Sequence, residues 1–321
     1  MSQQRVLISD YAWPDVEIER GILAQGGAEL VVAPASDLTT LCDLAGGVDA
    51  IMTCWAPIPA EVIKLVENCC VVARLGIGLD NIDVDFCTRQ GIPVTNVPDY
   101  CQVEVAEHTL ALLLALARNI GIFHQDARQG VYARDHGPPL LRLAGRTLGL
   151  VGLGGIGRMV ADKAAGLGLR VIATRRDLSR VSGEIPTMPL GELLAQSDFI
   201  SLHLPLDDTN NQLIGGPELA MMKPGSFLIN TARGGLVDHQ ALAAALESGQ
   251  LAGAALDVQD PEPPPLDKPP YNHPHVIVTP HSAFISEESL LDLRTRASNQ
   301  VVQCLHGEVP DNLVNPEVLR C

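Results

Sequence analysis

Three side chains in the second half of the chain have the chemistry needed to bind an anion and move a proton. Arg233, Glu262 and His281 each lie beyond a short apolar run, and we predict these runs to be strands, at 226–230, 252–256 and 276–278. An arginine can hold a carboxylate through two parallel hydrogen bonds and polarise an adjacent carbonyl group. A histidine can exchange a proton near neutral pH, and a glutamate beside it can orient the imidazole and stabilise its charged form. The three residue types therefore predict binding of an anionic substrate and acid/base chemistry.

Each of these residues also has a structural explanation when taken singly. Arg233 could be a surface charge ahead of a helix, Glu262 a loop charge beside prolines, and His281 a capped turn residue. In an open α/β sheet, residues just past the carboxyl ends of the strands converge on the crevice where ligands bind. The combined pattern therefore favours a catalytic set over three separate surface residues.

A glycine-rich segment predicts a dinucleotide site; its residues are Gly152, Leu153, Gly154, Gly155, Ile156 and Gly157. The segment follows a predicted strand at 146–151 and precedes a predicted helix at 159–166. The first glycine permits the tight turn, the second lets the main chain approach the phosphates, and the third lets the helix pack on the strand. The amino terminus of the helix then faces the anion. This order of strand, glycine turn and helix makes the motif specific.

The next predicted strand, at 169–174, is followed by Arg175 and Arg176, where a carboxylate normally accepts hydrogen bonds from the adenosine ribose of NAD. An arginine cannot accept those bonds, but it can pair with a 2′-phosphate. The two arginines therefore favour NADP over NAD, with NAD still possible. The alternative is a solvated loop end at which Asp177 supplies the acidic group from a shifted position.

The composition indicates sizeable apolar cores and small-molecule partners. The chain has 321 residues, 46% of them hydrophobic, and a formal net charge of −16. Nucleic acid or an anionic membrane would need a basic face, so we expect neither as a partner. The first residues lead directly into a strand pattern, and the most apolar helical run, at 109–117, is far shorter than the ~20 residues needed to cross a bilayer. We therefore expect a cytoplasmic protein.

Strand-like and helix-like runs alternate along the chain, which predicts an α/β fold with doubly wound parallel sheets. A second alternating series fills 146–279, and the final helix, at 287–305, has no strand left beside it in the sequence. All eight cysteines lie before residue 102 or after residue 303, which suggests that the two chain ends build one unit. We predict two Rossmann-like or flavodoxin-like domains with a cleft between them. Residues 1–101 and 282–321 form a discontinuous substrate-binding domain, and residues 102–281 form the dinucleotide-binding domain.

The connection between the two series carries a long helix and an irregular arm. The helix, predicted at 103–119, has leucines around most of its circumference, at Leu110, Leu112, Leu113, Leu114 and Leu116. We expect it to be buried on nearly every side, which one domain face could not achieve alone. The arm, at 121–141, is too long for an ordinary connection and is a candidate dimer contact. The alternative is a mobile surface loop.

Other polar clusters have simpler interpretations. His273 and His275 approach metal-ligand spacing with His281, but they lie in a proline-rich loop, so we expect no metal. The acidic pair Asp207 and Asp208 is interpreted as the amino terminus of a helix.

Over its whole length the chain resembles the D-isomer-specific 2-hydroxyacid dehydrogenases. The motifs that carry the resemblance are GLGGIG, NTARGGLVD, ALDVQDPEPP and TPHSA. The resemblance implies that Arg233 binds the substrate carboxylate, that Glu262 supports the acid/base His281, and that Asp257 contacts the nicotinamide carboxamide. It also implies that the main-chain nitrogens of Ile77 and Gly78 hold the substrate carboxylate, and that two chains exchange arms in a symmetric homodimer.

Within that family the chain looks most like the branch that includes the C-terminal-binding-protein corepressors and their bacterial relatives, through segments at 10–15, 96–101, 107–109 and 281–284. Arg175 departs from the acidic residue usual in the family. Ile77 stands where phosphite dehydrogenases carry a lysine, which disfavours phosphite. Glu262 stands where formate dehydrogenases carry a glutamine, which disfavours formate.

Further site residues complete the prediction. Trp55, Tyr100 and Phe284 would suit a substrate with an apolar or aromatic side group, although each could equally be an ordinary core or surface aromatic. The predicted cofactor contacts beyond the glycine segment are Arg175, Arg176, Pro205, Thr231, Ala232 and Asp257.

The function predicted from these residues is NADP(H)-dependent reduction of a 2-oxoacid by a D-2-hydroxyacid dehydrogenase. A hydride would pass to the carbonyl carbon while His281 delivers a proton and Arg233 stabilises the developing negative charge. The alternative is a dinucleotide-sensing scaffold like the corepressor branch, in which turnover is incidental. Because that branch can retain the same three side chains, turnover numbers on 2-oxoacids discriminate between the two.

Overall fold

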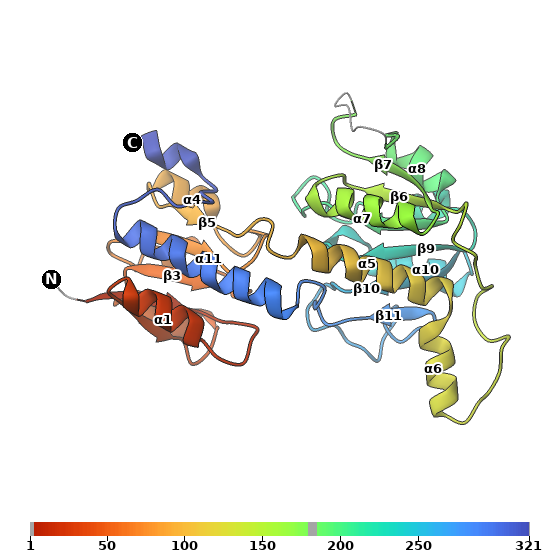
Figure 1. The fold of residues 1–321 in the computed structure, drawn as a ribbon, viewed down its shortest axis with the longest axis horizontal. Helices are drawn as coiled ribbons and strands as arrows, with labels where there is room; N and C mark the ends of the chain where they lie inside the picture. Colours follow the sequence, from red (N-terminus) through yellow and green to blue (C-terminus); the bar gives the residue numbers. More distant parts are fainter. Residues whose placement is uncertain (1–2, 179–184, 321) are drawn as a thin grey trace. The chain divides into compact units, whose positions relative to one another are not determined.

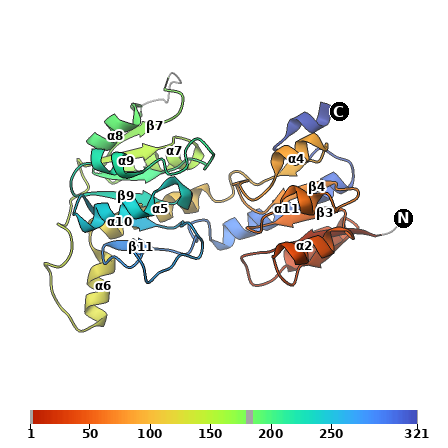
Figure 2. The ribbon, with the colours of Figure 1, turned by 180° about the vertical axis from the view of Figure 1, so that it is seen from behind.

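The computed structural model describes residues 3–178 and 185–320, and the chain divides into two compact units. Unit 1 combines Met1–Tyr100 with Ser286–Cys321, and unit 2 is Cys101–Ile285 (Figures 1 and 2). Residues 282–285 group with unit 2, whereas they were expected in the first domain. The reason is local, since main-chain nitrogens of Ser282 and Ala283 bind the carboxylate of Asp257.

Unit 1 is a parallel sheet of five strands in the order β2-β1-β3-β4-β5. The strands are β1 (Gln4–Ile8), β2 (Ala28–Val32), β3 (Ala50–Thr53), β4 (Val71–Arg74) and β5 (Val94–Thr95). The helices are α1 (Glu17–Gln25), α2 (Leu38–Ala45), α3 (Ala60–Ile63), α4 (Val84–Arg89), α11 (Glu287–Leu305) and the short 3₁₀ helix η2 (Pro316–Arg320). The chain reverses its winding direction after β2, so the carboxyl ends of β1 and β3 flank the switch point where such sheets bind ligands.

Alternate side chains of the unit 1 strands serve two apolar cores. In β1, Val6 and Ile8 pack under α1 and α11, whereas Leu7 faces the core under α2, α3 and α4. Figures 1 and 2 show these two sets of helices on opposite faces of the sheet. A buried ion pair joins α11 to α1, because Arg294 donates from Nε and Nη2 to the two carboxylate oxygens of Glu19, both at 2.8 Å. The C-terminal helix is therefore an integral part of the first unit.

Unit 2 is a parallel sheet of six strands in the order β11-β10-β9-β8-β6-β7. The strands are β6 (Thr147–Val151), β7 (Arg170–Thr174), β8 (Phe199–Leu202), β9 (Ser226–Asn230), β10 (Leu251–Leu256) and β11 (Val276–Val278). The helices are α5 (Gln102–Ala117), α6 (Ile120–Arg128), α7 (Gly155–Gly166), α8 (Leu190–Gln196), α9 (Gly216–Met221), α10 (His239–Glu247) and the short η1 (Gly234–Leu236). The winding direction changes at β6, which has β7 on one side and β8 on the other. Unit 2 therefore has its switch point at the glycine-rich segment.

Helices α5 and α7 cover one face of this sheet and α8, α9 and α10 cover the other (Figures 1 and 2). In β9, Phe227 and Ile229 pack toward α5 and α7, whereas Leu228 packs toward the opposite helices. Phe227 stacks on Phe199 of β8 with ring centroids 5.3 Å apart. Both sheets are thus parallel and covered on both faces, as the alternation of runs predicted.

Two expectations about the connecting region are wrong. The arm is not irregular from residue 121, because α6 occupies Ile120–Arg128. Helix α5 is covered largely within one chain: Leu110, Leu112, Leu113 and Leu116 are buried. It packs between α7 and strands β9 and β10, which together cover more of the helix than a single domain face was expected to. Val103, near the start of α5, is exposed, and further exposed apolar side chains follow the helix, at Ile120, Val131, Tyr132 and Leu140.

No single helix within 3–178 and 185–320 is long and apolar enough to cross a membrane. Helices α5 and α6 meet that criterion only when they are taken together, and they are bent by 65° relative to each other.

Candidate active site

The glycine-rich segment forms a tight turn between β6 and α7. Gly152 has a φ of 102°, and a Cβ atom there would lie 2.2 Å from the main-chain oxygen of His203. A Cβ atom on Gly157 would lie 2.5 Å from the main-chain oxygen of Gly152. A larger residue at position 157 would therefore push α7 away from the turn after β6, and one at position 152 would collide with the main chain that follows β8.

Gly154 differs from these two glycines because it faces open space. A Cβ atom there would have no neighbour within 4 Å, and both Gly154 and Gly155 are exposed. Helix α7 begins at Gly155, so its first main-chain nitrogens point toward this opening. The open approach at Gly154, at a helix amino terminus, fits a pyrophosphate, which needs close approach and hydrogen-bond donors, whereas at Gly155 a Cβ atom would lie 2.6 Å from the Gln102 side chain.

Arg175 and Arg176 follow β7 at the same edge of the sheet. Arg176 is exposed and donates to Oδ2 of Asp207 at 2.7 Å. Asp207 and Asp208 do not begin a helix, contrary to the expectation from the sequence. They open a turn in which Oδ1 of Asp207 accepts from the main-chain nitrogen of Thr209 at 2.9 Å.

Pro205 opens the same loop after β8, and its main-chain oxygen accepts a hydrogen bond from Nδ2 of Asn210 at 2.7 Å. The predicted contacts Thr231 and Ala232 lie in the turn that follows β9. Thr231 is buried and shares a hydrogen bond of 2.9 Å with Thr109 of α5. The structure thus places these cofactor candidates at the carboxyl ends of β8 and β9, which follow β6 in the order of the sheet.

Glu262 and His281 are in direct contact. Nδ1 of His281 lies 2.8 Å from Oε2 of Glu262, and the other carboxylate oxygen of Glu262 accepts from the main-chain nitrogen of Gln259 at 2.8 Å. Partial burial opposes ionisation of Glu262. The hydrogen bond and charge of His281, helped by Gln259 and Arg233, outweigh burial and lower the pKa of Glu262. The carboxylate is therefore charged and oriented toward the imidazole.

Arg233 is brought to the same place by the turn after β9. Asn230 organises this turn, because its Nδ2 donates to the main-chain oxygen of Arg233 at 2.8 Å and its Oδ1 accepts from the main-chain nitrogen of Ala232 at 3.0 Å. A Cβ atom on Gly234 would lie 2.1 Å from the carbonyl carbon of Gln259. Glycine at this position therefore lets the Arg233 turn pack against the loop that carries Glu262.

Asp257 is buried and holds the turn that carries His281. Its Oδ1 accepts from the main-chain nitrogen of Ser282 at 2.9 Å and from the hydroxyl of Thr279 at 2.6 Å, and its Oδ2 accepts from the main-chain nitrogen of Ala283 at 3.0 Å. His281 itself has a φ of 51°, a left-handed conformation that is uncommon for a residue with a side chain. This positioning role of Asp257 was not predicted from the sequence.

Thr279 and His108 extend the same network and were also missed. Nε2 of His108, on α5, lies 3.1 Å from the Thr279 hydroxyl and 3.5 Å from Oδ1 of Asp257. The sequence signal for Thr279 is its place in TPHSA, two positions before the candidate histidine. His108 is distant in the sequence, so only a structure brings it to this network.

The predicted substrate residues are divided between the units. In unit 2, Phe284 is buried and its ring meets the His281 imidazole edge-on, with centroids 6.3 Å apart. In unit 1, Trp55 is 43% exposed beyond β3. Its main-chain nitrogen donates at 2.6 Å to Asp10, which lies beyond β1. Asp10 therefore ties together the two loops at the switch point of unit 1.

Ile77 and Gly78 lie in the loop beyond β4 and are partly buried, as is Tyr100 at the end of unit 1. Nδ2 of Asn96 donates to the main-chain oxygen of Ile77 at 2.8 Å and so steadies this loop. The loop is therefore held in place at the carboxyl edge of the unit 1 sheet.

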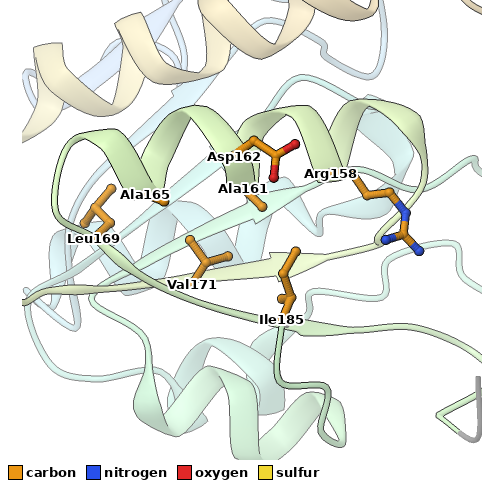
Figure 3. Close-up of a pocket in the computed structure, with 7 residues that line it drawn as sticks. All are labelled: Arg158, Ala161, Asp162, Ala165, Leu169, Val171 and Ile185. Carbon is orange, nitrogen blue, oxygen red and sulfur yellow. The ribbon is translucent and has the colours of Figure 1, made fainter. Parts of the chain in front are cut away.

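A surface hollow of about 450 Å³ lies between α7 and β7 (Figure 3). Its lining residues are Arg158, Ala161, Asp162, Ala165, Leu169, Val171 and Ile185. Figure 3 shows Arg158 at one end of the hollow and Leu169 at the other. The hollow lies beside β7, at one edge of the sheet. The strands that precede Arg233, Glu262 and His281 are β9, β10 and β11, toward the opposite edge, so this hollow is not their binding site.

The two loop histidines, His273 and His275, meet edge-on with ring centroids 5.1 Å apart. In the part of the chain that the structure describes, no three histidine, cysteine, aspartate or glutamate side chains are grouped as metal ligands.

Comparison with known proteins defines the class to which this fold and site belong. The sequence model of one protein family, described as the D-isomer specific 2-hydroxyacid dehydrogenase, NAD binding domain, matches residues 110–283. A glyoxylate reductase from Korarchaeum cryptofilum is 38% identical over 271 residues, which cover 82% of this chain and 81% of that protein.

Solved structures share the whole architecture. The TT0316 protein from Thermus thermophilus has a TM-score of 0.89 and 35% identity, over 97% of this chain and 100% of that one. An NADPH-dependent glyoxylate/hydroxypyruvate reductase from Sinorhizobium meliloti, in complex with NADP and malonate, has a TM-score of 0.86 and 28% identity, over 99% of this chain and 98% of that one.

The chain therefore belongs to the D-isomer specific 2-hydroxyacid dehydrogenase family. It is an oxidoreductase of the NAD(P)-dependent D-2-hydroxyacid dehydrogenase type.

Proposed function

We propose that the protein is an NADP(H)-dependent 2-oxoacid reductase in which Arg233 binds the substrate carboxylate and His281 is the acid/base. The observation that carries this proposal is the 2.8 Å contact between Nδ1 of His281 and Oε2 of Glu262, in a set that Arg233 also joins. In this proposal an anion-binding arginine, a proton-transferring histidine and its supporting carboxylate, on the loops after β9, β10 and β11, form one site. Unrelated surface residues would have no reason to bring these three groups together.

The protonated imidazole is the group that completes reduction. Nδ1 of His281 is bound to Glu262, and we assign Nε2 as the ring nitrogen that donates a proton to the substrate oxygen. Glu262 stabilises the charged imidazole and fixes the ring orientation. In the direction of oxidation the same nitrogen accepts the proton from the hydroxyl group.

Arg233 supplies charge to the other end of the substrate. Its guanidinium can hold the carboxylate bidentately and lies close enough to the site to stabilise negative charge that develops on the adjacent carbonyl oxygen. Ile77 and Gly78, in unit 1, are proposed to bind a substrate carboxylate through their main-chain nitrogens. In this account unit 1 is the substrate-binding domain.

The dinucleotide is proposed to bind along the carboxyl edge of unit 2. When bound, it supplies or accepts the hydride. The open turn at Gly154 would take the pyrophosphate, Pro205, Thr231 and Ala232 would line the path, and Asp257 would face the carboxamide. Arg175 and Arg176 favour the 2′-phosphate of NADP, and the NADP complex of the related Sinorhizobium meliloti enzyme is consistent with that choice.

The substrate class is proposed to be small 2-oxoacids. Because the related enzymes are named glyoxylate reductase and glyoxylate/hydroxypyruvate reductase, glyoxylate and hydroxypyruvate are the first candidate substrates for this protein. Trp55, Tyr100 and Phe284 would instead allow a larger apolar side group. The likeness to the corepressor branch stays a prediction, and with it the alternative of a dinucleotide-sensing scaffold with little turnover.

A substrate and cofactor screen tests this proposal. Initial rates would be measured with glyoxylate, hydroxypyruvate, pyruvate, phenylpyruvate and 4-methylthio-2-oxobutyrate, each with NADPH and with NADH. We expect rapid turnover of at least one 2-oxoacid and a higher kcat/KM for NADPH. Negligible turnover with all five, despite dinucleotide binding, would favour the sensing scaffold.

A further inference from the structure

The loops that follow β7 and β8 are joined by an ion pair. Nη2 of Arg176 donates to Oδ2 of Asp207 at 2.7 Å and lies 3.4 Å from the hydroxyl of Thr209. Strands β7 and β8 are the two neighbours of β6 in the sheet. The ion pair therefore joins the loops on either side of the glycine turn, at the edge proposed for the dinucleotide.

Asp207 is held in place by its own loop as well as by Arg176. Oδ1 accepts from the main-chain nitrogen of Thr209 at 2.9 Å and also from the Thr209 hydroxyl, while the main-chain nitrogen of Asp207 donates to Oδ1 of Asn210 at 2.8 Å. The bonds from Thr209 and the charge of Arg176 lower the pKa of Asp207 to about 2. The carboxylate is therefore charged at neutral pH and stays in position when Arg176 is engaged elsewhere.

We propose that Asp207 is a specificity-determining residue that limits the preference for NADPH over NADH. This inference rests on the proposed binding of the 2′-phosphate by Arg175 and Arg176. A 2′-phosphate bound by Arg176 competes with Asp207 for the guanidinium, and it meets a fixed negative charge beside it. The 2′-hydroxyl of NADH is uncharged and can donate a hydrogen bond to the same carboxylate.

Asp207 thus supplies the acidic group that is missing at the end of β7. The sequence suggested Asp177 for this role, because it lies next to the arginines. The structure instead brings an acid from the loop after β8, 31 positions away from Arg176. Two arginines and an acidic acceptor at the same edge of the sheet predict an enzyme that binds both dinucleotides. The Arg176–Asp207 pair would then set the ratio of the affinities for NADPH and NADH.

Substitution of Asp207 by asparagine tests the inference directly. Asparagine keeps the size of the side chain and a carbonyl oxygen for the bonds from Thr209 but removes the charge. Dissociation constants for NADPH and NADH would be measured by fluorescence titration, without substrate. We expect Asp207→Asn to tighten NADPH binding by about fivefold to tenfold, as expected for loss of an exposed ion pair and of like-charge repulsion. NADH binding should be unchanged or weaker.

Two further variants separate this local effect from overall charge. Asp208→Asn removes the same charge from the neighbouring residue and should change the NADPH/NADH ratio by less than about twofold, because exposed charges are screened over short distances. In an Arg176→Gln background, Asp207→Asn should lose most of its effect on the ratio, since the competition for Arg176 is gone. Equal shifts from the two asparagine variants, or an unchanged ratio in Asp207→Asn, would overturn the inference. Tighter binding of NADH than NADPH by the wild type would instead contradict the proposed NADP preference, while the change caused by Asp207→Asn could still be measured.

Discussion

The main-chain nitrogen of His281 donates a hydrogen bond of 2.7 Å to the main-chain oxygen of Asp257. The side chain of Asp257 then binds the next two main-chain nitrogens, of Ser282 and Ala283. One buried aspartate therefore fixes three successive residues of the turn, including the candidate acid/base in its left-handed conformation. The position of the imidazole depends on β10 as much as on its own loop.

Thr279→Val should weaken this arrangement. The substitution removes the hydroxyl that donates to Oδ1 of Asp257 at 2.6 Å and leaves a buried carboxylate with one donor fewer. Loss of one such bond costs about 1–3 kcal/mol in the free energy of unfolding. We expect a lower urea midpoint and a reduced kcat. Thr279→Ser keeps the hydroxyl and should retain most of the activity; equal losses in both variants would count against the role of the hydroxyl.

Glu262→Gln should change the pH dependence of reduction. Because the pKa of Glu262 is lowered, its carboxylate stays charged down to lower pH than an ordinary glutamate, and its support of the imidazolium is lost only as pH falls through that lowered value. At higher pH the carboxylate is fully charged and favours the protonated imidazole. Glutamine removes that support, so the basic limb of the kcat/KM profile for reduction should move to lower pH. A profile that coincides with that of the wild type would argue against the pairing of Glu262 and His281.

Arg294→Leu should destabilise the first unit strongly. Glu19 is completely buried and receives both of its charged hydrogen bonds from Arg294. Removal of one partner from a buried pair costs about 3–5 kcal/mol in the free energy of unfolding. Arg296→Leu, on the same helix, removes partly exposed pairs with Asp99 and Asp292 and a 3.3 Å hydrogen bond to Asn312, and should cost about 1 kcal/mol. Urea denaturation of the two variants tests the contrast, and similar midpoints would show that the Glu19 pair is not the main link between α1 and α11.

A homodimer is predicted from the exposed apolar side chains of the arm. Ile120 is 55% exposed, Tyr132 85% and Leu140 44%, in a segment that begins with α6. A second chain that covers them would form an obligate type of interface, with about 2,000 Å² or more buried in total. Light scattering should therefore give twice the chain mass, and Tyr132→Asp should shift the equilibrium toward the single chain. A wild-type mass of 34.2 kDa at micromolar concentration would contradict the homodimer and show that the arm is a free surface loop.

The order of elements could be predicted from the sequence because apolar runs bounded by glycine and proline are strong local signals. Strand β9 and helix α11 have the predicted bounds, 226–230 and 287–305. Helix α6 was missed because Gly121, its second residue, was interpreted as the start of the irregular arm, although Ile120, Phe123 and Ala127 recur at helical spacing.

Site residues on motifs could be located in the same way, and the expected contact between Glu262 and His281 is present. The partners of those residues could not. His108 reaches Thr279 across 171 positions and Arg176 reaches Asp207 across 31, so neither contact leaves a pattern in a local window. The burial of α5 was misjudged for the same reason, since α7, β9 and β10 meet it only in the folded unit.

The most direct measurement of the central claim is the turnover of a His281→Asn variant with its best 2-oxoacid. Asparagine tolerates the left-handed conformation at this position but cannot serve as a proton donor near neutral pH. Loss of proton transfer should lower kcat by about 10²–10⁴-fold, while the dissociation constant for NADPH, measured by fluorescence, stays close to that of the wild type. A variant that binds NADPH normally and retains nearly full kcat would contradict the assignment of His281 as the acid/base of this dehydrogenase.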